Sequence, residues 1–403
     1  MTEPVDHLVV VGASLAGLRA VEGARKAGFD GRITLVGAEE HLPYDRPPLS
    51  KSYLDEQAPE ATTFRTADVL RDELGVDLRL GAPATGLDTT AKQLQVGDTS
   101  LGYDALVVAT GAAARTLPGS LAGVHTLRTL DDAVAVRAAL DAGARTVVIG
   151  AGFIGSEVAS GARKRGLDVT VVEALPTPLV RAVGEVMGNA CAALHRRNGT
   201  DLRCGVGVAA LEGTGRVERV VLADGTAIDA DLVVVGIGAV PATDWLRDSG
   251  LRLDDGIVCD EYLFTGAEGV YAAGDVARWY NPLFDRAMRL EHWTSAAEQG
   301  AAAARNALDP SAAKPYQTVP YFWSDWYDSR IQFVGVPATD EIRVVEGDPE
   351  RGGRMVALYR EGSRLAGVLT LNGQNVIMKY RGLIMKRAGW DDALTFAQQR
   401  KAA

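Results

Sequence analysis

The sequence has few cysteines, few aromatic residues and no long apolar run. Its 403 residues include three cysteines, Cys191, Cys204 and Cys259, which lie far apart and form no CxxC pair. This spacing gives neither a disulfide framework nor a thiolate metal site, and it fits a reducing compartment. A membrane helix needs roughly 18 apolar residues, whereas the longest runs here, such as LVVVGIGAV, have the length of a strand. We therefore expect no membrane span and no metal site.

The sequence also has no excess of positive charge and shows no targeting segment. The formal net charge is -10 and the pI is near 5.2, which argues against nucleic acid as the main partner. The chain passes from MTEPVD directly into a strand pattern, without a basic region or a cleavage site. We expect a cytoplasmic protein that binds neither nucleic acid nor a membrane.

An internal repeat is the most informative feature that is present. HLVVVGASLAGLRAVEGARKAG and then GRITLVGAEE are matched by RTVVIGAGFIGSEVASGARKRG and then LDVTVVEA. Each copy has a β-branched strand, a glycine turn, an Ala-rich helix and a second strand that ends in an acid. The leading glycines, Gly12 and Gly150, lie 138 residues apart, and each copy later has a further apolar strand, DALVVATGA or DLVVVGIGA. The alternation predicts an α/β protein with two doubly wound, Rossmann-type sheets and two nucleotide sites.

The second copy carries the complete dinucleotide fingerprint. Gly150, Gly152 and Gly155 stand between strand and helix, and Glu173 ends the next strand 23 residues after Gly150. An acid that binds a ribose hydroxyl is expected after about 20 residues. Glycines let backbone amides approach a pyrophosphate, whose charge the helix N-terminus favours. A carboxylate at Glu173 would repel a 2′-phosphate and so favours NADH over NADPH, although Arg181 could reach such a phosphate.

The first copy departs from this pattern. It reads Gly12-Ala-Ser-Leu-Ala-Gly17, with Ser14 in place of the second glycine, and its acid is Glu39. The segment EHLPYDRPPLSK, residues 40–51, follows, and its three prolines exclude a regular helix or a central strand. It is either a surface linker or a rigid loop that holds Arg46 and Lys51 against a cofactor.

Two later stretches narrow the chemistry. TGAEGVYAAGDVARW places Asp275 at the end of an apolar strand, where a carboxylate can bind a ribityl hydroxyl. In EHWTSAAEQGAAAARN, Ser295 and Glu298 are predicted to form a capping box for an Ala-rich helix. The N-terminus of that helix would stabilise the negative charge of a reduced flavin.

Together, the GxSxxG turn with RPPLSK, the GxGxxG turn with Glu173, YAAGD and EHW resemble the two-dinucleotide flavoprotein reductases of glutathione-reductase-like fold. More narrowly, the chain resembles the FAD-dependent NADH:ferredoxin reductases of bacterial oxygenase systems. The resemblance extends over essentially the whole chain. It implies FAD and NADH as cofactors and a [2Fe–2S] ferredoxin that feeds a haem-thiolate monooxygenase or a ring-hydroxylating dioxygenase.

The resemblance also implies site residues. For FAD they are Gly12, Ser14, Ala16, Glu39, Arg46, Lys51, Ala84, Arg128, Asp275, Glu291, His292, Trp293 and Trp323. For NADH they are Gly150, Gly152, Phe153, Ile154, Gly155, Glu173, Arg181 and Gly238. Lys51 and Glu157 are the implied catalytic pair beside the flavin ring. Hydride transfer needs no acid or base at the reacting carbon, so we interpret His7, His41, His125 and His195 as structural or surface residues.

The predicted organisation is a discontinuous FAD domain, 1–113 and 241–318, with an NADH domain, 114–240, inserted into it. An α+β C-terminal domain, 319–403, follows. Within YFWSDWYDSR, the resemblance places Trp323 near the flavin on the partner-facing side, and we interpret Tyr321, Phe322, Trp326 and Tyr327 as core.

An acidic ferredoxin would need local basic patches on a reductase of net charge -10. Candidates are Lys379, Arg381, Lys386, Arg387, Arg278, Arg286, Arg289 and Arg330, and the first four could equally be a solvated helix face. We expect a monomer or a weak homodimer.

Other activities fit the same architecture less well. An NADH oxidase or disulfide reductase needs a redox cysteine on the first helix or just before the LPY turn. The first helix has none, and Glu40 and His41 precede Leu42. A rubredoxin reductase and a redox-signalling flavoprotein, similar to apoptosis-inducing factor, remain the alternatives.

Overall fold

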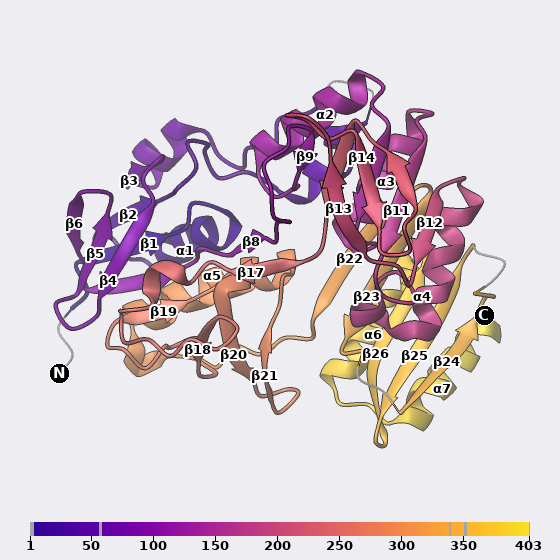
Figure 1. Ribbon diagram of the computed structural model, residues 1–403. Coiled ribbons are helices and arrows are strands. Elements are labelled where there is room, and N and C mark those ends of the chain that lie inside the picture. Colours follow the sequence, from indigo (N-terminus) through magenta and orange to yellow (C-terminus); the bar gives the residue numbers. More distant parts are fainter. Residues whose placement is uncertain (1–3, 56–58, 338–339, 350–352, 403) are drawn as a thin grey trace. The chain divides into compact units, whose positions relative to one another are not determined.

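The computed structural model describes residues 4–55, 59–337, 340–349 and 353–402, and it forms two compact units (Figure 1). Unit 1 is drawn from Met1–Asp45, Ala61–Ala113 and Val240–Thr318. Unit 2 is drawn from Arg46–Glu60, Ala114–Ala239 and Val319–Ala403. The segment 46–60 therefore groups with the second fingerprint and the C-terminal sheet. Two short strands, β8 (Ala112–Ala114) and β17 (Ala239–Pro241), lie where the chain passes from one unit to the other.

The core of unit 1 is a five-stranded parallel sheet in the order β19-β7-β1-β2-β3. Its strands are β1 (His7–Val11), β2 (Arg32–Val36), β3 (Val76–Arg79), β7 (Ala105–Val108) and β19 (Val270–Ala272). They are short runs of Val, Leu and Ile, which suits strands covered by helices on both faces. The main helices are α1 (Leu15–Lys26) and α5 (Trp293–Leu308), and they pack against each other.

Unit 1 also contains two small sheets and four short helical turns. One sheet is antiparallel, formed by β4 (Ala84–Asp88), β5 (Gln93–Val96) and β6 (Thr99–Gly102). The other contains β18 (Ile257–Cys259), β20 (Ala277–Asn281) and β21 (Arg286–Arg289). The turns are η3 (Val69–Glu73), η4 (Asp244–Leu246), η5 (Gly274–Val276) and η6 (Pro310–Ala312).

Unit 2 repeats the first sheet. Its parallel strands run β12-β11-β10-β16-β9, so β10 stands between β11 and β16 as β1 stands between β2 and β7. The strands are β9 (Val124–His125), β10 (Thr146–Ile149), β11 (Val169–Glu173), β12 (Asp201–Cys204) and β16 (Leu232–Val235). The helices are α2 (Leu130–Asp141), α3 (Phe153–Lys164) and α4 (Val180–Arg197). The prediction of two α/β sheets from the repeat is confirmed.

A small antiparallel sheet and two short turns complete this part of unit 2. The sheet is formed by β13 (Val208–Glu212), β14 (Arg219–Leu222) and β15 (Ala227–Asp229). The turns are η1 (Pro47–Ser50), in the proline-rich segment for which no regular helix and no central strand was expected, and η2 (Ser52–Leu54), which directly follows that segment.

The repeat extends to single side chains. Arg25, near the end of α1, donates to the carbonyl oxygen of Phe29 at 2.7 Å and to that of Leu74 at 2.8 Å. Arg163, 138 residues later at the end of α3, donates to the carbonyl oxygens of Leu167 at 2.9 Å and Asn198 at 3.1 Å. An arginine at the equivalent position of each copy thus binds backbone carbonyl oxygens beyond the end of the helix.

The C-terminal part of unit 2, orange to yellow in Figure 1, is an antiparallel sheet in the order β22-β23-β26-β25-β24 followed by two helices. The strands are β22 (Tyr321–Trp326), β23 (Ser329–Gly335), β24 (Glu341–Glu346), β25 (Met355–Glu361) and β26 (Arg364–Leu371). The helices are α6 (Gln374–Met385) and α7 (Trp390–Ala402). The predicted hairpin at REGSR joins β25 and β26.

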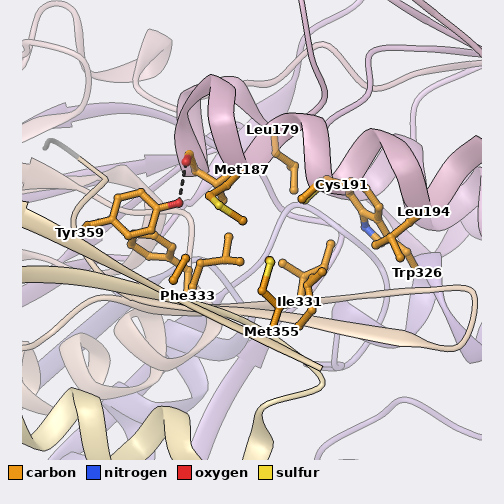
Figure 2. Packing of buried hydrophobic residues seen from close by; sticks show 14 residues of the cluster. Leu179, Met187, Cys191, Leu194, Trp326, Ile331, Phe333, Met355 and Tyr359 are labelled. Atoms are coloured by element: carbon orange, nitrogen blue, oxygen red, sulfur yellow. Dashed lines mark hydrogen bonds between the residues drawn. The ribbon is translucent and has the colours of Figure 1, made fainter. Parts of the chain in front are cut away.

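Helix α4 lies against this C-terminal sheet through an apolar cluster. Figure 2 shows Met187 and Cys191 of α4 facing Phe333, Met355 and Tyr359 of the sheet. The Tyr359 hydroxyl donates to the backbone carbonyl of α4 at 2.7 Å, which satisfies a buried phenol. No helix among the described residues is long and apolar enough to cross a membrane.

Candidate active site

Both glycine turns lie between the first strand of a parallel sheet and the following helix. Gly12 and Gly150 have φ of +116° and +100°, which favours glycine. A Cβ on Gly12 would lie 2.1 Å from the Ala109 carbonyl oxygen, and one on Gly150 would lie 2.4 Å from that of Gly236. Glycine is therefore required at the first position of each turn, for steric reasons within the fold itself.

The third position of the turn has a different requirement. Gly152 has φ -76°, and a Cβ built on it would lie 3.7 Å from its nearest neighbour, the carbonyl oxygen of Gly236. That is ordinary van der Waals contact, so a small side chain fits. Ser14 occupies the matching place in the first copy, in extended backbone at the N-cap of α1.

The helices after both turns begin without a side-chain cap. Neither the N-cap of α1 nor that of α3 supplies one, and neither helix has an acid in its first turn. Helix α5 begins in the same way after His292. By contrast, α2 has a complete capping box from Thr129 and Asp132. Uncapped first-turn amides at the positive end of a helix dipole suit a pyrophosphate, so these residues fit the dinucleotides that the sequence predicts.

Glu173 lies at the end of β11 and is hydrogen-bonded to the second glycine turn. Its two carboxylate oxygens accept from the backbone amides of Ala151 at 2.8 Å and Leu175 at 2.9 Å. The first of these amides belongs to the fingerprint itself, so the fold sets the position of the acid relative to the glycines. Arg181 is exposed on the first turn of α4.

In unit 1, the predicted FAD residues around the first turn come together. Gly274, next to Asp275, lies so close to α1 that a Cβ on it would be 3.1 Å from that of Ala16. The same Cβ would be 3.7 Å from the Cβ of Ala296, in the first turn of α5. At the start of α5, the Trp293 indole donates to the Asp45 carboxylate at 2.7 Å. Asp275 and the N-termini of α1 and α5 thus occupy one region.

The other predicted residues of unit 1 are less tightly grouped in the structure. Glu39 accepts from the hydroxyl of Tyr44 at 2.5 Å, which ties the acid to the proline-rich segment. Ala84 begins β4 and pairs with Val96. Glu291 accepts from Arg289 at 2.8 Å.

In unit 2, the proline-rich loop places its two cations on different partners. Arg46 donates to the Arg128 carbonyl oxygen at 2.6 Å. Lys51 forms an ion pair with Glu157 of α3, with Nζ 2.8 Å from Oε1. Side-chain exposures of 19% for Lys51 and 3% for Glu157 make this a largely buried pair. The predicted catalytic pair is therefore in direct contact.

The remaining NADH residues surround the second turn. Phe153, at the start of α3, packs on Phe322 of β22 with ring centroids 4.7 Å apart, whereas Ile154 is exposed. The carbonyl oxygen of Gly238 accepts from the Arg115 amide at 2.9 Å, and its φ is +100°.

Within the aromatic segment, Trp326 is fully buried, and Phe322 and Tyr327 pack against the same core cluster. Trp323 is half-buried and stacks on Tyr321, with centroids 5.8 Å apart.

The capping box predicted for α5 is wrong. The helix begins at Trp293, so Ser295 already lies inside the first turn and cannot serve as the N-cap. Ser295 and Glu298 instead both contact the buried hydroxyl of Tyr316, at 3.4 and 3.0 Å. The pattern was correct for a helix start but displaced by about one turn, as boundary predictions often are.

The cysteines are free thiols outside the two fingerprint turns. Cys191 is in the core under α4, and burial raises its pKa to about 12. Burial also raises the pKa values of Cys204 in β12 and Cys259 in β18. Thiols with raised pKa values are poor nucleophiles and poor redox groups.

Sequence reasoning missed two serines that complete the Lys51–Glu157 pair. The Ser50 hydroxyl donates to one carboxylate oxygen of Glu157, and the Ser324 hydroxyl donates to the other. Ser50 directly precedes the predicted lysine, and Ser324 is the one small polar residue within YFWSDW, which are weak signals at best. Sequence separations of 107 and 167 residues from Glu157 explain why no local pattern revealed them.

Family models match most of the chain. A model for pyridine nucleotide-disulphide oxidoreductases matches residues 6–300, and a model for a reductase C-terminal domain matches residues 321–401. The chain belongs to the pyridine nucleotide-disulphide oxidoreductase family. It is an α/β oxidoreductase of the flavoprotein class, and this family uses FAD and NAD(H).

Individual relatives of this oxidoreductase are similar over nearly their full length. Rhodocoxin reductase of Rhodococcus erythropolis is 40% identical over 91% of this chain and 86% of its own. The ferredoxin–NAD(+) reductase component of the biphenyl dioxygenase system of Paraburkholderia xenovorans is 38% identical over 88% of this chain and 87% of its own. The solved covalent complex of putidaredoxin reductase with putidaredoxin matches with a TM-score of 0.90 and 34% identity, over 95% of this chain and 93% of that one.

Proposed function

We propose that the chain is an NADH-dependent ferredoxin reductase, in which bound FAD supplies the conversion of a two-electron donor into single electrons for a [2Fe–2S] ferredoxin. Relatives named for ferredoxin reduction support this proposal. The observation that carries it is the lack of a thiol where disulfide-reducing enzymes of this architecture need one. Helix α1 and the 40–44 segment contain no cysteine. Electrons must therefore leave by a route other than a protein disulfide.

The residues of the two turns would hold the two dinucleotides. We assign FAD to the turn of Gly12, Ser14 and Ala16, and NADH to the turn of Gly150 and Gly152. Their uncapped helix N-termini would bind the pyrophosphates. The other FAD contacts that we propose are Glu39, Arg46, Lys51, Ala84, Arg128, Asp275, Glu291, His292, Trp293 and Trp323. The other NADH contacts are Phe153, Ile154, Gly155, Glu173, Arg181 and Gly238.

In this scheme Lys51 and Glu157 set the charge beside the reacting rings. The Lys51 ammonium would stabilise negative charge as it develops, and the buried Glu157 carboxylate would hold that ammonium in place. Because both groups are largely removed from water, their charges act more strongly than at a surface.

We further propose the domain roles predicted from the sequence. Residues 1–113 and 241–318 would bind FAD, 114–240 NADH, and 319–403 would contribute to the partner-facing side. A cytoplasmic monomer or weak homodimer fits the three free thiols.

One assay tests the function. The FAD-loaded protein is given NADH or NADPH, and cytochrome c reduction is followed with and without a [2Fe–2S] ferredoxin. We expect turnover to require the ferredoxin and NADH to be the better donor. Ferredoxin-independent turnover, or preference for NADPH, would contradict the proposal.

Lys51→Ala tests the catalytic assignment. We expect FAD to be retained less well or its reduction by NADH to slow by about tenfold or more, because one fixed charge is lost. Lys164→Ala is the control, since Lys164 lies on the same helix as Glu157 and its ion pair with Asp55, at 3.9 Å, is long and half-exposed. Normal FAD content and reduction rate in Lys51→Ala would remove the residue from the mechanism.

We also propose that the exposed face of α6 docks the ferredoxin. Met378 and Met385 are 48% and 39% exposed, and Lys379 and Lys386 beside them are exposed as well. The two methionines are seven residues apart, as are the two lysines, and this spacing of about two helical turns places each pair on one side of the helix. An apolar centre with basic neighbours suits an acidic partner with an apolar contact area.

Most of the other basic candidates have local carboxylate or carbonyl partners. Arg278 pairs with Asp254, Arg289 with Asp255 and Glu291, and Arg330 with Asp325, while Arg381 donates to the Val319 carbonyl. Arg286 donates to the Phe284 carbonyl.

Charge reversal tests this surface. In Lys379→Glu/Lys386→Glu we expect the KM for ferredoxin to rise about tenfold at low salt, with a smaller rise at high salt. Reduction of ferricyanide, a small acceptor, should stay unchanged. Lys26→Glu, an exposed lysine at the end of α1, is the matched control. Equal ferredoxin KM values in the double variant and the control would reject the α6 face.

A further inference from the structure

Glu157 receives donors from two separate segments of unit 2, the 46–60 loop and β22. Lys51 Nζ lies 2.8 Å from Oε1, and the Ser50 hydroxyl donates to Oε2 from the end of η1. From β22, the Ser324 hydroxyl donates to Oε1, and the Asp325 amide points to the same oxygen at 3.4 Å. A carboxylate that is 3% exposed needs such partners, because burial of an unpaired charge is costly.

The direction of the Ser324 hydrogen bond is determined by its second partner. The Trp326 indole N–H, in the fully buried core of Figure 2, donates to the Ser324 oxygen at 2.8 Å. An indole nitrogen can only donate and a carboxylate can only accept. The serine hydroxyl must therefore accept from Trp326 and donate to Glu157. The two hydrogen bonds, from Trp326 to Ser324 and from Ser324 to Glu157, connect the core of the C-terminal sheet with the acid on α3.

We propose that Ser324 and Ser50 are positioning residues of the reductase, which orient the Glu157 carboxylate toward Lys51. The inference rests on the proposed function, because Lys51 and Glu157 are its catalytic pair. The two hydroxyls approach different carboxylate oxygens from two different segments, so together they restrict rotation of the carboxylate about its last torsion. Loss of either hydroxyl leaves the ammonium with a less well oriented partner.

The chain offers a matched control on the same helix. Ser160, one turn after Glu157, is 2% exposed and accepts from the backbone amide of Tyr327 at 2.6 Å. Ser160→Ala therefore weakens the attachment of α3 to the β22–β23 hairpin without removing a donor from Glu157. A purely structural role for Ser324 predicts equal behaviour of the Ser324→Ala and Ser160→Ala variants.

The kinetic test uses the FAD-loaded proteins in a stopped-flow instrument. For Ser324→Ala and Ser50→Ala we expect the limiting rate of flavin reduction by NADH to fall about tenfold, since misplacement of a fixed group affects the rate strongly. The apparent Kd for NADH should stay unchanged, and Ser160→Ala should match the parent protein. In a Glu157→Gln background, Ser324→Ala should have no further effect on the rate, because both changes act through one group.

A second readout does not depend on turnover. Acylation of Lys51 by acetic anhydride, measured by mass spectrometry of its peptide, requires the free amine. We expect it to be several-fold faster in Ser324→Ala and Ser50→Ala than in the parent, and unchanged in Ser160→Ala. Ser50→Ala keeps the test decisive if Ser324→Ala folds poorly.

Parent-like rates and acylation in both serine variants, or a full Ser324 effect in the Glu157→Gln background, would overturn the inference. Failure of the parent protein to reduce a ferredoxin would reject the proposed function alone. In that event the acylation results would still decide whether the serines orient the pair.

Discussion

Helices α1 and α3 follow equivalent glycine turns in the two copies, but they pack in opposite ways. α1 lies against α5 through small residues, so close that a Cβ on Gly300 would be 2.1 Å from the Ala16 carbonyl oxygen. α3 lies against the C-terminal sheet through polar side chains, with Glu157 bonded to Ser324 and Ser160 to the amide of Tyr327. One helix contact is apolar and close, and the other is a buried hydrogen-bond network.

Three aligned positions account for this difference. Leu18, Arg19 and Glu22 of α1 correspond, 138 residues later, to Ser156, Glu157 and Ser160 of α3. Arg19 and Glu22 pair with each other near the surface of unit 1, whereas all three residues of α3 are buried. The backbone frame is thus set by residues that the copies share, and the chemistry is set by those that they do not. Under the proposed function, the same strand–turn–helix repeat would supply a binding turn in both copies and, through Glu157 of α3, a catalytic group in the second copy.

The largest effect is expected from substitution of the first glycine of each turn, a position that the two copies share. Gly12→Ala and Gly150→Ala combine positive φ with a backbone clash, and each should cost about 3 kcal/mol of stability or more. Gly12→Ala should also lose FAD, and Gly150→Ala should retain FAD but lose reduction by NADH. Flavin absorbance, NADH titration and denaturant unfolding measure these outcomes.

The controls for these glycines lie at the ends of the same helices. Gly28 and Gly166 also have positive φ, +87° and +74°, but a Cβ on either meets no atom of the described residues within 4 Å. Their alanine variants should cost only about 1 kcal/mol and leave both cofactors bound. Equal losses of stability at all four positions would show that the strain of a positive φ, and not the close contact of the Cβ with a backbone carbonyl, is the main cause.

The second effect is a pH dependence at the contact between Ser156 of α3 and His195 of α4, where α1 has Leu18 in place of the serine. His195 donates or accepts at Ser156, 3.1 Å, and Tyr327, 2.7 Å, and burial lowers its pKa from 6.5 to about 4. As the pH falls below 6.5, the unfolded chain therefore takes up a proton that the folded protein does not. Between pH 7 and pH 5 this should remove about 2 kcal/mol of stability.

Urea unfolding of the parent and of His195→Gln checks this pH dependence. The stability advantage of the parent should shrink over this pH interval. Ser156→Ala, which keeps the histidine, should lower stability by a similar amount at each pH. A pH-independent difference between the parent and His195→Gln would contradict the assignment.

The third effect distinguishes the roles of Glu39 and Glu173, the acids that follow the second strand of each copy. Glu173→Gln removes the charge that would repel a 2′-phosphate but keeps an acceptor oxygen, so the preference for NADH over NADPH should fall about tenfold. Glu173→Ala should lower it too, with weaker binding of both nucleotides, because two backbone amides lose their acceptor. Glu39→Gln should reduce FAD content and leave the nucleotide preference unchanged. Steady-state kcat/KM values with both nucleotides decide the matter.

The smallest effect is expected from exchange of the residue at the third turn position. Gly152→Ser, which introduces the residue found at the matching place of the first turn, has room for its side chain and should change stability by less than about 1 kcal/mol. NADH affinity in Gly152→Ser should stay within about threefold of the parent. A large loss would show that the ligand, and not the fold, requires glycine at position 152.

Local patterns predicted the scaffold well, and the reasons are physical. The strand, turn and helix of each copy are contiguous in sequence, and the steric need for glycine at positions 12 and 150 comes from within that unit. Helix α5 was also predicted, but its start was displaced, because Ser295 lies inside the helix and contacts the phenol of Tyr316, 21 residues later in the sequence. Capping patterns describe only neighbouring residues and contain no information about such a distant partner.

Spacing and residue type were sufficient for two α/β sheets, two turns suited to dinucleotides and an acid at the end of β11. Folding of the chain added the surroundings of Glu157, where Ser50, Lys51 and Ser324 converge from segments far apart in sequence. Short-range sterics and hydrogen bonding determine the first group of features. The second depends on which surfaces pack together, because a buried carboxylate is stable only where several distant donors meet it.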